Sequence, residues 1–117
     1  MDIETLQSFR GTSKYHEHAS IGYNRILLTD GCNFVRERFE AYWLFDLILS
    51  YQSFVKFQNN TFQVWRLEKQ KGGAWLISCT DGNDMVLLVQ ELEYSDFPID
   101  DFKIWVVDGI AMLPTEY

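Results

Sequence analysis

The side chains that could do chemistry are two histidines close together and one acid in an apolar stretch. His16 and His18 lie two residues apart, and Asp46 is the one member of residues 41–49 that is neither apolar nor aromatic. Imidazoles and carboxylates within hydrogen-bond reach of each other are the usual groups of general acid–base catalysis. One hypothesis is therefore a small enzyme that uses Asp46 with His16, His18 or Asp30 in a cleft beside a helix.

A metal site finds less support in the sequence. Residues two positions apart in a helix point about 200° away from each other, so His16 and His18 could share a ligand only in an extended segment. Cys32 and Cys79 are far apart in the chain and provide no second close pair of ligands. A Ser-His-Asp order, a Gly-rich phosphate loop and the HExxH and CxxC motifs are all missing. We expect no metal ion and no cofactor.

Asp46 has two interpretations, one structural and one catalytic. Its neighbours Tyr42, Trp43, Leu47 and Ser50 predict a buried carboxylate, which costs several kcal/mol unless it accepts hydrogen bonds. A Tyr hydroxyl, a Trp indole N–H or Ser50 could donate them. Buried acids of this kind are more often held in structural networks than used in catalysis, so the structural role is the stronger interpretation.

The element that must position these groups is the apolar stretch over residues 41–55. The start signals Thr29-Asp30-Gly31 precede it, the pair Asn59-Asn60 follows it, and no Gly or Pro lies between positions 32 and 55. This pattern predicts one long helix over residues 33–56, which would be about 35 Å long. Upstream, residues 2–9 predict one or two helical turns, residues 12–19 a helical turn or loop, and residues 26–28 a brief strand or docking segment.

From residue 61 onward the pattern changes to strands. Residues 61–68 and 74–80 predict a hairpin, and the shifting apolar phase of the first strand indicates either a bulge, which we favour, or two partly covered faces. Residues 85–92 follow a tight turn and are apolar on both faces, which predicts a central strand. Residues 102–107 and 110–113 predict a fourth strand and a short closing edge.

These elements predict a two-layer α+β domain in which the long central helix packs on a four- to five-stranded antiparallel meander. A chain of 117 residues fits a single domain over positions 1–117, with residues 1–60 mainly helical and residues 61–117 forming the strands.

Charge is distributed unevenly along the chain. The net charge is −7, and no Lys or Arg occurs between Lys71 and Lys103, where seven acids lie. The acidic C-terminal half of the chain should repel phosphate backbones and attract basic surfaces, so we expect no direct binding of nucleic acid. An acidic surface that only keeps the protein in solution is the other interpretation.

Nineteen aromatic residues exceed what one core of this size obviously needs, and three tryptophans lie on different predicted strands. Aromatic side chains beside acids are typical of protein-binding surfaces, although core packing alone would also explain them. The predicted interaction residues are Trp65, Trp75, Trp105, Glu91, Glu93, Asp96, Asp100 and Asp101.

The start of the chain lacks the basic and apolar regions of a signal peptide, and no apolar run reaches the roughly 20 residues of a membrane span. We therefore expect a cytoplasmic protein without a membrane segment, with Cys32 and Cys79 as free thiols. The sequon at Asn59 would then not be glycosylated.

Short motifs are spread over nearly the whole chain. They are Phe9-Arg10-Gly11-Thr12 with Tyr15 and His18, Thr29-Asp30-Gly31, Ala41-Tyr42-Trp43-Leu44 with Asp46, Ser50-Tyr51-Gln52, Phe62-Gln63-Val64-Trp65, Asp81-Gly82-Asn83, Asp96-Phe97-Pro98 and Leu113-Pro114-Thr115-Glu116-Tyr117. In these motifs the chain resembles a family of small uncharacterised bacterial proteins, a domain of unknown function also met in phage and mobile-element genomes. The resemblance implies one complete domain and carries over no functional residue. Ala19 departs from it, because a bulky aromatic residue is expected there.

The leading functional hypothesis is a non-enzymatic protein-interaction module, an accessory or inhibitor protein of phage or mobile-element origin. Its partner would be a protein with a basic surface, bound through the acidic sheet half because opposite potentials attract. The small enzyme built on Asp46 is the alternative.

Overall fold

The computed structural model describes residues 6, 8–19 and 25–117. Its elements, in chain order, are β1 (His16–His18), β2 (Ile26–Leu28), α2 (Asp30–Arg38), α3 (Tyr42–Tyr51), α4 (Val55–Gln58), β3 (Phe62–Lys69), β4 (Trp75–Thr80), β5 (Val86–Leu92), β6 (Asp101–Val107), β7 (Ile110–Met112) and the 3₁₀ helix η1 (Pro114–Glu116). The predicted helical turns over residues 2–9 lie mostly outside the described residues. The α+β class is confirmed.

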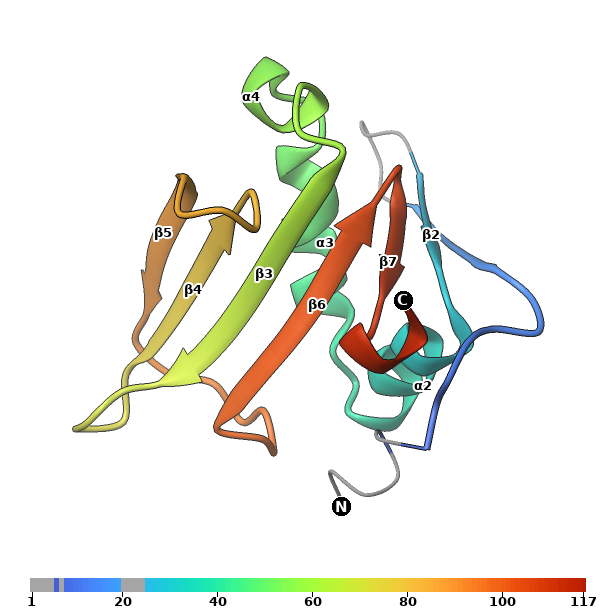
Figure 1. Cartoon of the computed structure of the whole chain (residues 1–117). Coiled ribbons are helices and arrows are strands. Elements are labelled where there is room, and N and C mark those ends of the chain that lie inside the picture. The colour runs from blue at the N-terminus through green and yellow to red at the C-terminus, as the bar shows by residue number, and fades with distance from the viewer. Residues whose placement is uncertain (1–5, 7, 20–24) are drawn as a thin grey trace.

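The seven strands of the described residues join one mixed sheet in the order β1-β2-β7-β6-β3-β4-β5, and the helices α2, α3 and α4 lie behind it in the view of Figure 1. Every neighbouring pair is antiparallel except β2 and β7, which pair in parallel. The predicted four- to five-stranded meander is therefore wrong. β3 lies between β4 and β6, because β6 returns past the first hairpin and pairs with β3 along seven residues, from Phe62 opposite Val107 to Glu68 opposite Asp101.

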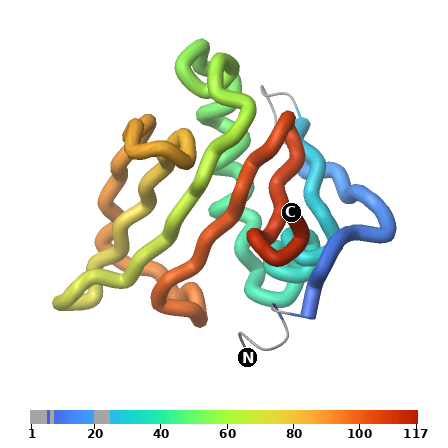
Figure 2. Tube along the Cα trace, in the orientation of Figure 1, coloured from blue at the N-terminus to red at the C-terminus, as the bar shows by residue number. Residues whose placement is uncertain are grey.

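The N-terminal part of the chain extends this sheet. The trace in Figure 2 shows β2 beside β7, and the register places Leu27 opposite Ile110. β2 confirms the brief strand predicted at residues 26–28. β1 is a strand where a helical turn or loop was predicted, because the backbone of residues 16–18 pairs with β2.

The long central helix predicted over residues 33–56 is wrong. The structure has three short helices there, α2, α3 and α4, separated at residues 39–41 and 52–54. At the first break the N–H of Ala41 donates to the C=O of Arg36 at 3.0 Å, which is the six-to-one hydrogen bond of a Schellman helix end. That motif needs a left-handed residue before Ala41, and Glu40 supplies it with φ of 50°.

Side chains account for the second break. Ser50 and Ser53 donate their hydroxyls to the carbonyls of Leu47 and Ser50, and the Gln52 amide donates to the carbonyl of Ile48. These bonds satisfy backbone acceptors that the next helical turn would have used. Phe54 then takes an extended conformation before α4 begins.

β3 is regular, so the bulge favoured there is wrong and the alternative of two partly covered faces is right. Its register with β4 and β6 is unbroken, and Gln63, Trp65 and Leu67 are buried while the residues between them are half-buried. The bulge lies instead in β5, at Leu87, which is an extra residue opposite the step from Cys79 to Thr80.

β5 is an edge strand and not the predicted central strand. No strand pairs with its far side within the described residues, and Val86 and Val89 are each 57 % exposed. The apolar residues on both faces of this strand had indicated a strand covered on both sides. They instead leave apolar side chains at the surface.

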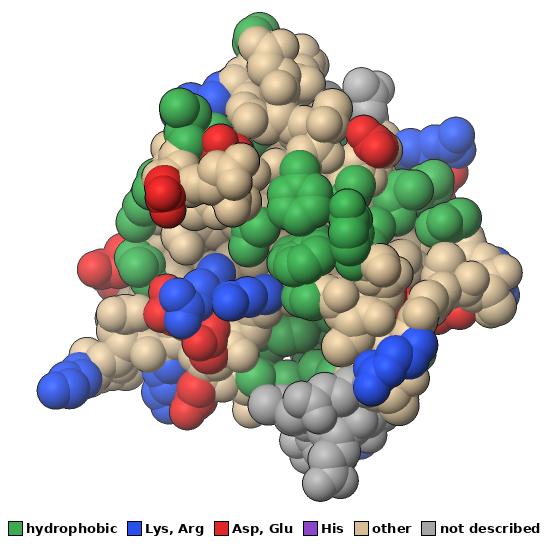
Figure 3. Space-filling model, in the orientation of Figure 1, with side chains coloured by type: hydrophobic (Ala, Val, Ile, Leu, Met, Phe, Trp, Pro, Cys, Tyr) green, Lys and Arg blue, Asp and Glu red, His purple; other side chains and the backbone are tan. Residues whose placement is uncertain are grey.

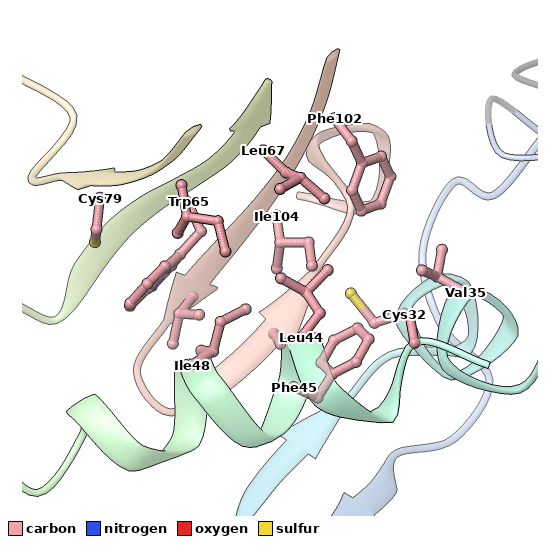
Figure 4. Packing of buried hydrophobic residues seen from close by; sticks show 14 of the residues in the cluster. Cys32, Val35, Leu44, Phe45, Ile48, Trp65, Leu67, Cys79, Phe102 and Ile104 are labelled. Atoms are coloured by element: carbon pink, nitrogen blue, oxygen red, sulfur yellow. The ribbon is translucent and has the colours of Figure 1, made fainter. Parts of the chain in front are cut away.

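The core lies between the sheet and the inner face of α3 (Figure 4). Leu44, Phe45 and Ile48 of α3 pack toward Trp65 and Ile104 of the sheet. Cys32 and Cys79 are also buried there as free thiols. Burial raises the pKa of Cys79 to about 12, and burial followed by the nearby Glu116 charge raises that of Cys32.

The helix break generates a prediction at Glu40. Glycine adopts positive φ without the steric cost that a side chain carries, so Glu40→Gly should raise the free energy of unfolding by about 0.5–1 kcal/mol. Arg38→Gly, at an exposed position inside α2, should lower it by about the same amount. Urea denaturation of both variants measures this. A loss of stability in Glu40→Gly equal to that in Arg38→Gly would mean that the helix runs through this point.

Candidate functional site

The histidines and acids chosen from the sequence meet in two pairs. His18, only 5 % exposed, places its Nε2 2.8 Å from Oδ1 of Asp46. Its Nδ1 lies 3.1 Å from Nη1 of Arg36. Because a guanidinium has no acceptor, Nδ1 must accept this bond, so the partners assign the ring proton to Nε2 and make it the donor to Asp46.

Arg36 holds the His18 ring in place from α2. Its guanidinium also donates to the carbonyl of Glu17 at 3.0 Å and to Oδ1 of Asn33 at 2.8 Å, and it lies over the Tyr42 ring at 5.6 Å from the centroid. Its Nε has no hydrogen-bond partner among the described residues, although Oε2 of Glu37 is 3.3 Å away. The arginine therefore joins β1, α2 and the start of α3.

His16 and Asp30 form the second pair, with 2.9 Å between Nε2 and Oδ1. The other oxygen of Asp30 accepts hydrogen bonds from the backbone N–H and the hydroxyl of Ser13, each at 2.8 Å. These bonds hold the pKa of Asp30 far below its usual range, the Ser13 backbone contributing most and His16 next. Asp30 is thus a fixed anion that fastens the segment before β1 to α2.

The two pairs are poorly arranged for general acid–base work. Both nitrogens of His18 are engaged, and the ring is buried while its carboxylate is 51 % exposed, so no ring nitrogen faces solvent. Asp46 borders a hollow of about 740 Å³, whereas His16 and Asp30 border a different one of about 530 Å³. The expectation that Asp46 is buried, with Tyr, Trp or Ser50 donors, is wrong because the side of α3 that carries it faces outward.

A third carboxylate, which sequence reasoning missed, closes the N-terminus of α2. Oε2 of Glu116 accepts from the N–H of Gly31 at 3.0 Å, and Oε1 accepts from the hydroxyl of Thr29 at 2.6 Å and from the N–H of Leu113 at 3.0 Å. A Cβ on Gly31 would lie 2.5 Å from Oε1, so a side chain at this position would have to displace the Glu116 carboxylate. The glycine in the first helical turn was the available signal.

The predicted interaction tryptophans lie in different places. Trp65 and Trp75 are each 2 % exposed and belong to the core, so they cannot contact a partner. Trp105 is half-buried on the open face of the sheet, where its ring lies 5.3 Å from that of Phe62 and 5.2 Å from that of Tyr117. Figure 3 shows apolar side chains gathered over this face.

Four of the five predicted acids are at the surface without a counter-charge. Glu91, Glu93, Asp96 and Asp100 are exposed, and none has an ion-pair partner within the part of the chain that the structure describes. Asp101 differs, because Arg66 binds it at 2.7 Å and lowers its pKa through that hydrogen bond.

The outer side of α3 forms a groove with β5 that the sequence did not reveal. The hollow beside Asp46 is lined by Trp43, Tyr51 and Phe54 together with Gln90 of β5. Trp43 also lines a second hollow, of about 300 Å³, beside Tyr94, Asp96 and other residues at the end of β5. We call these two hollows the α3–β5 groove. Helical spacing of the aromatic side chains was the signal, but they were assigned to the core.

Within the described part of the chain, no three His, Cys, Asp or Glu side chains lie close enough together to hold a metal ion. No helix in the described ranges has the length and apolar character required to cross a membrane.

Comparison with known proteins gives one match. A family model described as a family of unknown function, DUF6876, matches residues 3–117. The resemblance to a family of unknown function is confirmed over nearly the whole chain. No curated protein and no solved structure matches it.

The His18–Asp46 bond generates a prediction about stability. Asp46→Leu would leave the buried Nε2–H of His18 without an acceptor, at a cost of about 1–3 kcal/mol, whereas Asp46→Asn keeps an acceptor oxygen. The Leu variant should therefore unfold at a clearly lower urea concentration than the Asn variant. In a His18→Phe background the difference should vanish, since the donor is gone. Equal midpoints for the wild type, Asn and Leu forms would mean that this bond adds no stability.

Asp30 generates a prediction about pH. Its folded pKa lies below the unfolded value of about 4, so the stability it provides is complete above that value and is lost as the pH falls toward the folded pKa. In urea titrations from pH 6 down to about 2, Asp30→Asn should flatten the acid-side loss of stability. Asp100→Asn, at an exposed carboxylate that has no ion-pair partner among the described residues, serves as the control. If the free energy of unfolding falls with decreasing pH equally steeply in the wild type and in Asp30→Asn, the prediction is contradicted.

Proposed function

The chain belongs to the DUF6876 family, a family of unknown function, and we propose that it is a non-enzymatic protein-interaction module that binds the basic surface of a partner protein. The binding surface would comprise the edge strand β5 and the segment that follows it to Asp101. An accessory or inhibitor role in a phage or other mobile element is part of the same proposal and draws on the sequence motifs alone.

The observation that carries the proposal is the combination of exposed apolar and acidic side chains on one edge. Val86 and Val89 of β5 are largely exposed, and Tyr94 just beyond it is 78 % exposed. Glu91 and Glu93 lie between them, and no base occurs from residue 72 to residue 102 to neutralise them. A partner with Lys or Arg around an apolar contact would fit both properties.

The backbone of β5 supports this choice of surface. Edge strands present unpaired N–H and C=O groups that another chain can use, and proteins usually limit this with charges or bulges. Here the bulge at Leu87 and the bond from Lys56 Nζ to the Leu87 carbonyl, at 3.1 Å, occupy the first part of the strand. The part from Val89 to Leu92 is protected by Glu91 and by Glu93 just after it, and these acids repel further copies of this chain while attracting a basic partner.

A small enzyme is the second candidate, and the hollow of about 740 Å³ beside Asp46 is the observation that favours it. Against it, His18 has no nitrogen left to exchange a proton with a substrate. Structural use of both His–Asp pairs explains the same contacts.

Charge reversal on the acidic edge tests the proposal. The immobilised chain should capture a partner from lysate at about 50 mM salt and lose it at about 500 mM, because exposed charges are screened. With the identified partner, Glu93→Lys should raise the dissociation constant about three- to tenfold.

The matched control is Ala19→Lys with Thr115→Lys, which changes the net charge by the same two units at exposed positions that follow β1 and β7, toward the other edge of the sheet from β5. It should leave most of the binding intact. A partner bound equally by Glu93→Lys, or equally at high salt, would contradict binding through this edge.

A further inference from the structure

The α3–β5 groove has aromatic walls. Trp43, Tyr51 and Phe54 follow one another along the outer side of α3 and the turn after it, and the rings of Tyr51 and Phe54 are 5.7 Å apart. The Tyr51 hydroxyl donates to Oε1 of Gln90 at 3.2 Å, which fixes this wall against β5. A rigid aromatic surface of this kind provides contact area and negative ring faces to a ligand.

Each of the two hollows that Trp43 lines also has a carboxylate in its lining. Trp43 and Asp46 are one helical turn apart and line the first hollow, while Asp96 lines the second, which Trp43 shares. One oxygen of Asp46 is bonded to His18, and the other has no hydrogen bond among the described residues. No Lys or Arg belongs to the described lining of either hollow, so a cation entering the groove meets no like charge.

From this arrangement we propose that the groove binds an arginine side chain of the partner, with its guanidinium over the Trp43 ring between Asp46 and Asp96. This inference rests on the proposed function and names the group that the partner inserts. A guanidinium suits the groove better than an ammonium, because it is planar, is weakly hydrated and stacks on aromatic rings while its edges donate to carboxylates. Nucleic acid would instead bring phosphates against both acids.

Binding of a blocked tripeptide, acetyl-Gly-Arg-Gly-amide, to the full chain at low salt tests the proposal. The indole N–H signal of Trp43 in ¹⁵N NMR, identified by its loss in Trp43→Leu, should shift in a saturable way. The peptide with citrulline, which has the same shape without the charge, should cause no such shift, and the lysine peptide should bind more weakly. Asp96→Asn should weaken arginine binding about threefold, as expected for one exposed charge contact.

Asp96→Asn is the main variant because Asp96, unlike Asp46, has no contact with His18, so its effect does not depend on the stability of the fold. Asp100→Asn is the matched control, since it removes the same charge from a residue that lines neither hollow. Three results would contradict arginine binding in the groove. They are equal shifts with the citrulline peptide, a shift of the Trp105 signal in place of the Trp43 signal, and equal weakening of binding by Asp100→Asn. Equal binding of the lysine peptide would overturn the assignment to arginine.

The two proposals fail in different ways. If Glu93→Lys weakens partner binding while Trp43→Leu and Asp96→Asn do not, the acidic edge binds the partner and the groove does not. If binding of the partner changes neither with Glu93→Lys nor with salt, the proposed function itself fails, whether or not the tripeptide shifts the Trp43 signal.

Discussion

The N-terminus of α2 is the point on which the rest of the structure depends. Free backbone N–H groups and the positive end of a helix favour carboxylates: Glu116 accepts from the N–H of Gly31, and Asp30 is the acid of the first helical turn. Glu116 brings the C-terminal segment after β7 onto this turn, and Asp30 brings the segment before β1 onto it. The parallel pairing of β2 and β7 follows, because β2 runs directly into this turn and the segment after β7 is bonded to it.

The orientation of α3 follows from the position of α2. The left-handed Glu40 turns the chain so that α3 starts in a new direction, with Leu44, Phe45 and Ile48 facing the sheet. Arg36 then contacts Tyr42 at the start of α3 and His18 on β1, and His18 bonds Asp46 from the other side. The histidine and acid pairs thus position helices, and on the outer side of α3 the second oxygen of Asp46 has no hydrogen bond among the described residues.

Exposed acidic and apolar groups therefore gather at one edge of the sheet. Asp96 shares a hollow with Trp43 of the aromatic wall, whereas Val89 and Glu91 alternate with Gln90 along β5 and so point to the other face of the sheet. Burial of these groups against a basic partner would satisfy both their charge and their apolar surface. The open face of the sheet near Trp105 is apolar too, but it carries the paired Arg66 and Asp101 and so offers no net charge of one sign.

Local patterns in the sequence account for part of this fold. Alternation, turn residues and composition predict the hairpin between β3 and β4, the turn before β5, the strand over residues 102–107, the α+β class and the uneven charge. The remaining features depend on contacts between distant parts of the chain. The sequence does not predict the helix break at Glu40, because a glutamate with positive φ has no local sequence signal. Hydrogen bonds at the end of α2 hold this break. β5 is an edge strand, and Trp65 and Trp75 lie in the core. Both positions depend on the order of the strands, which is set by the distant strand that pairs with β3 and not by the hydrophobicity of a strand alone. The carboxylate of Glu116 meets Gly31 across 85 residues, a separation at which no local pattern records the contact.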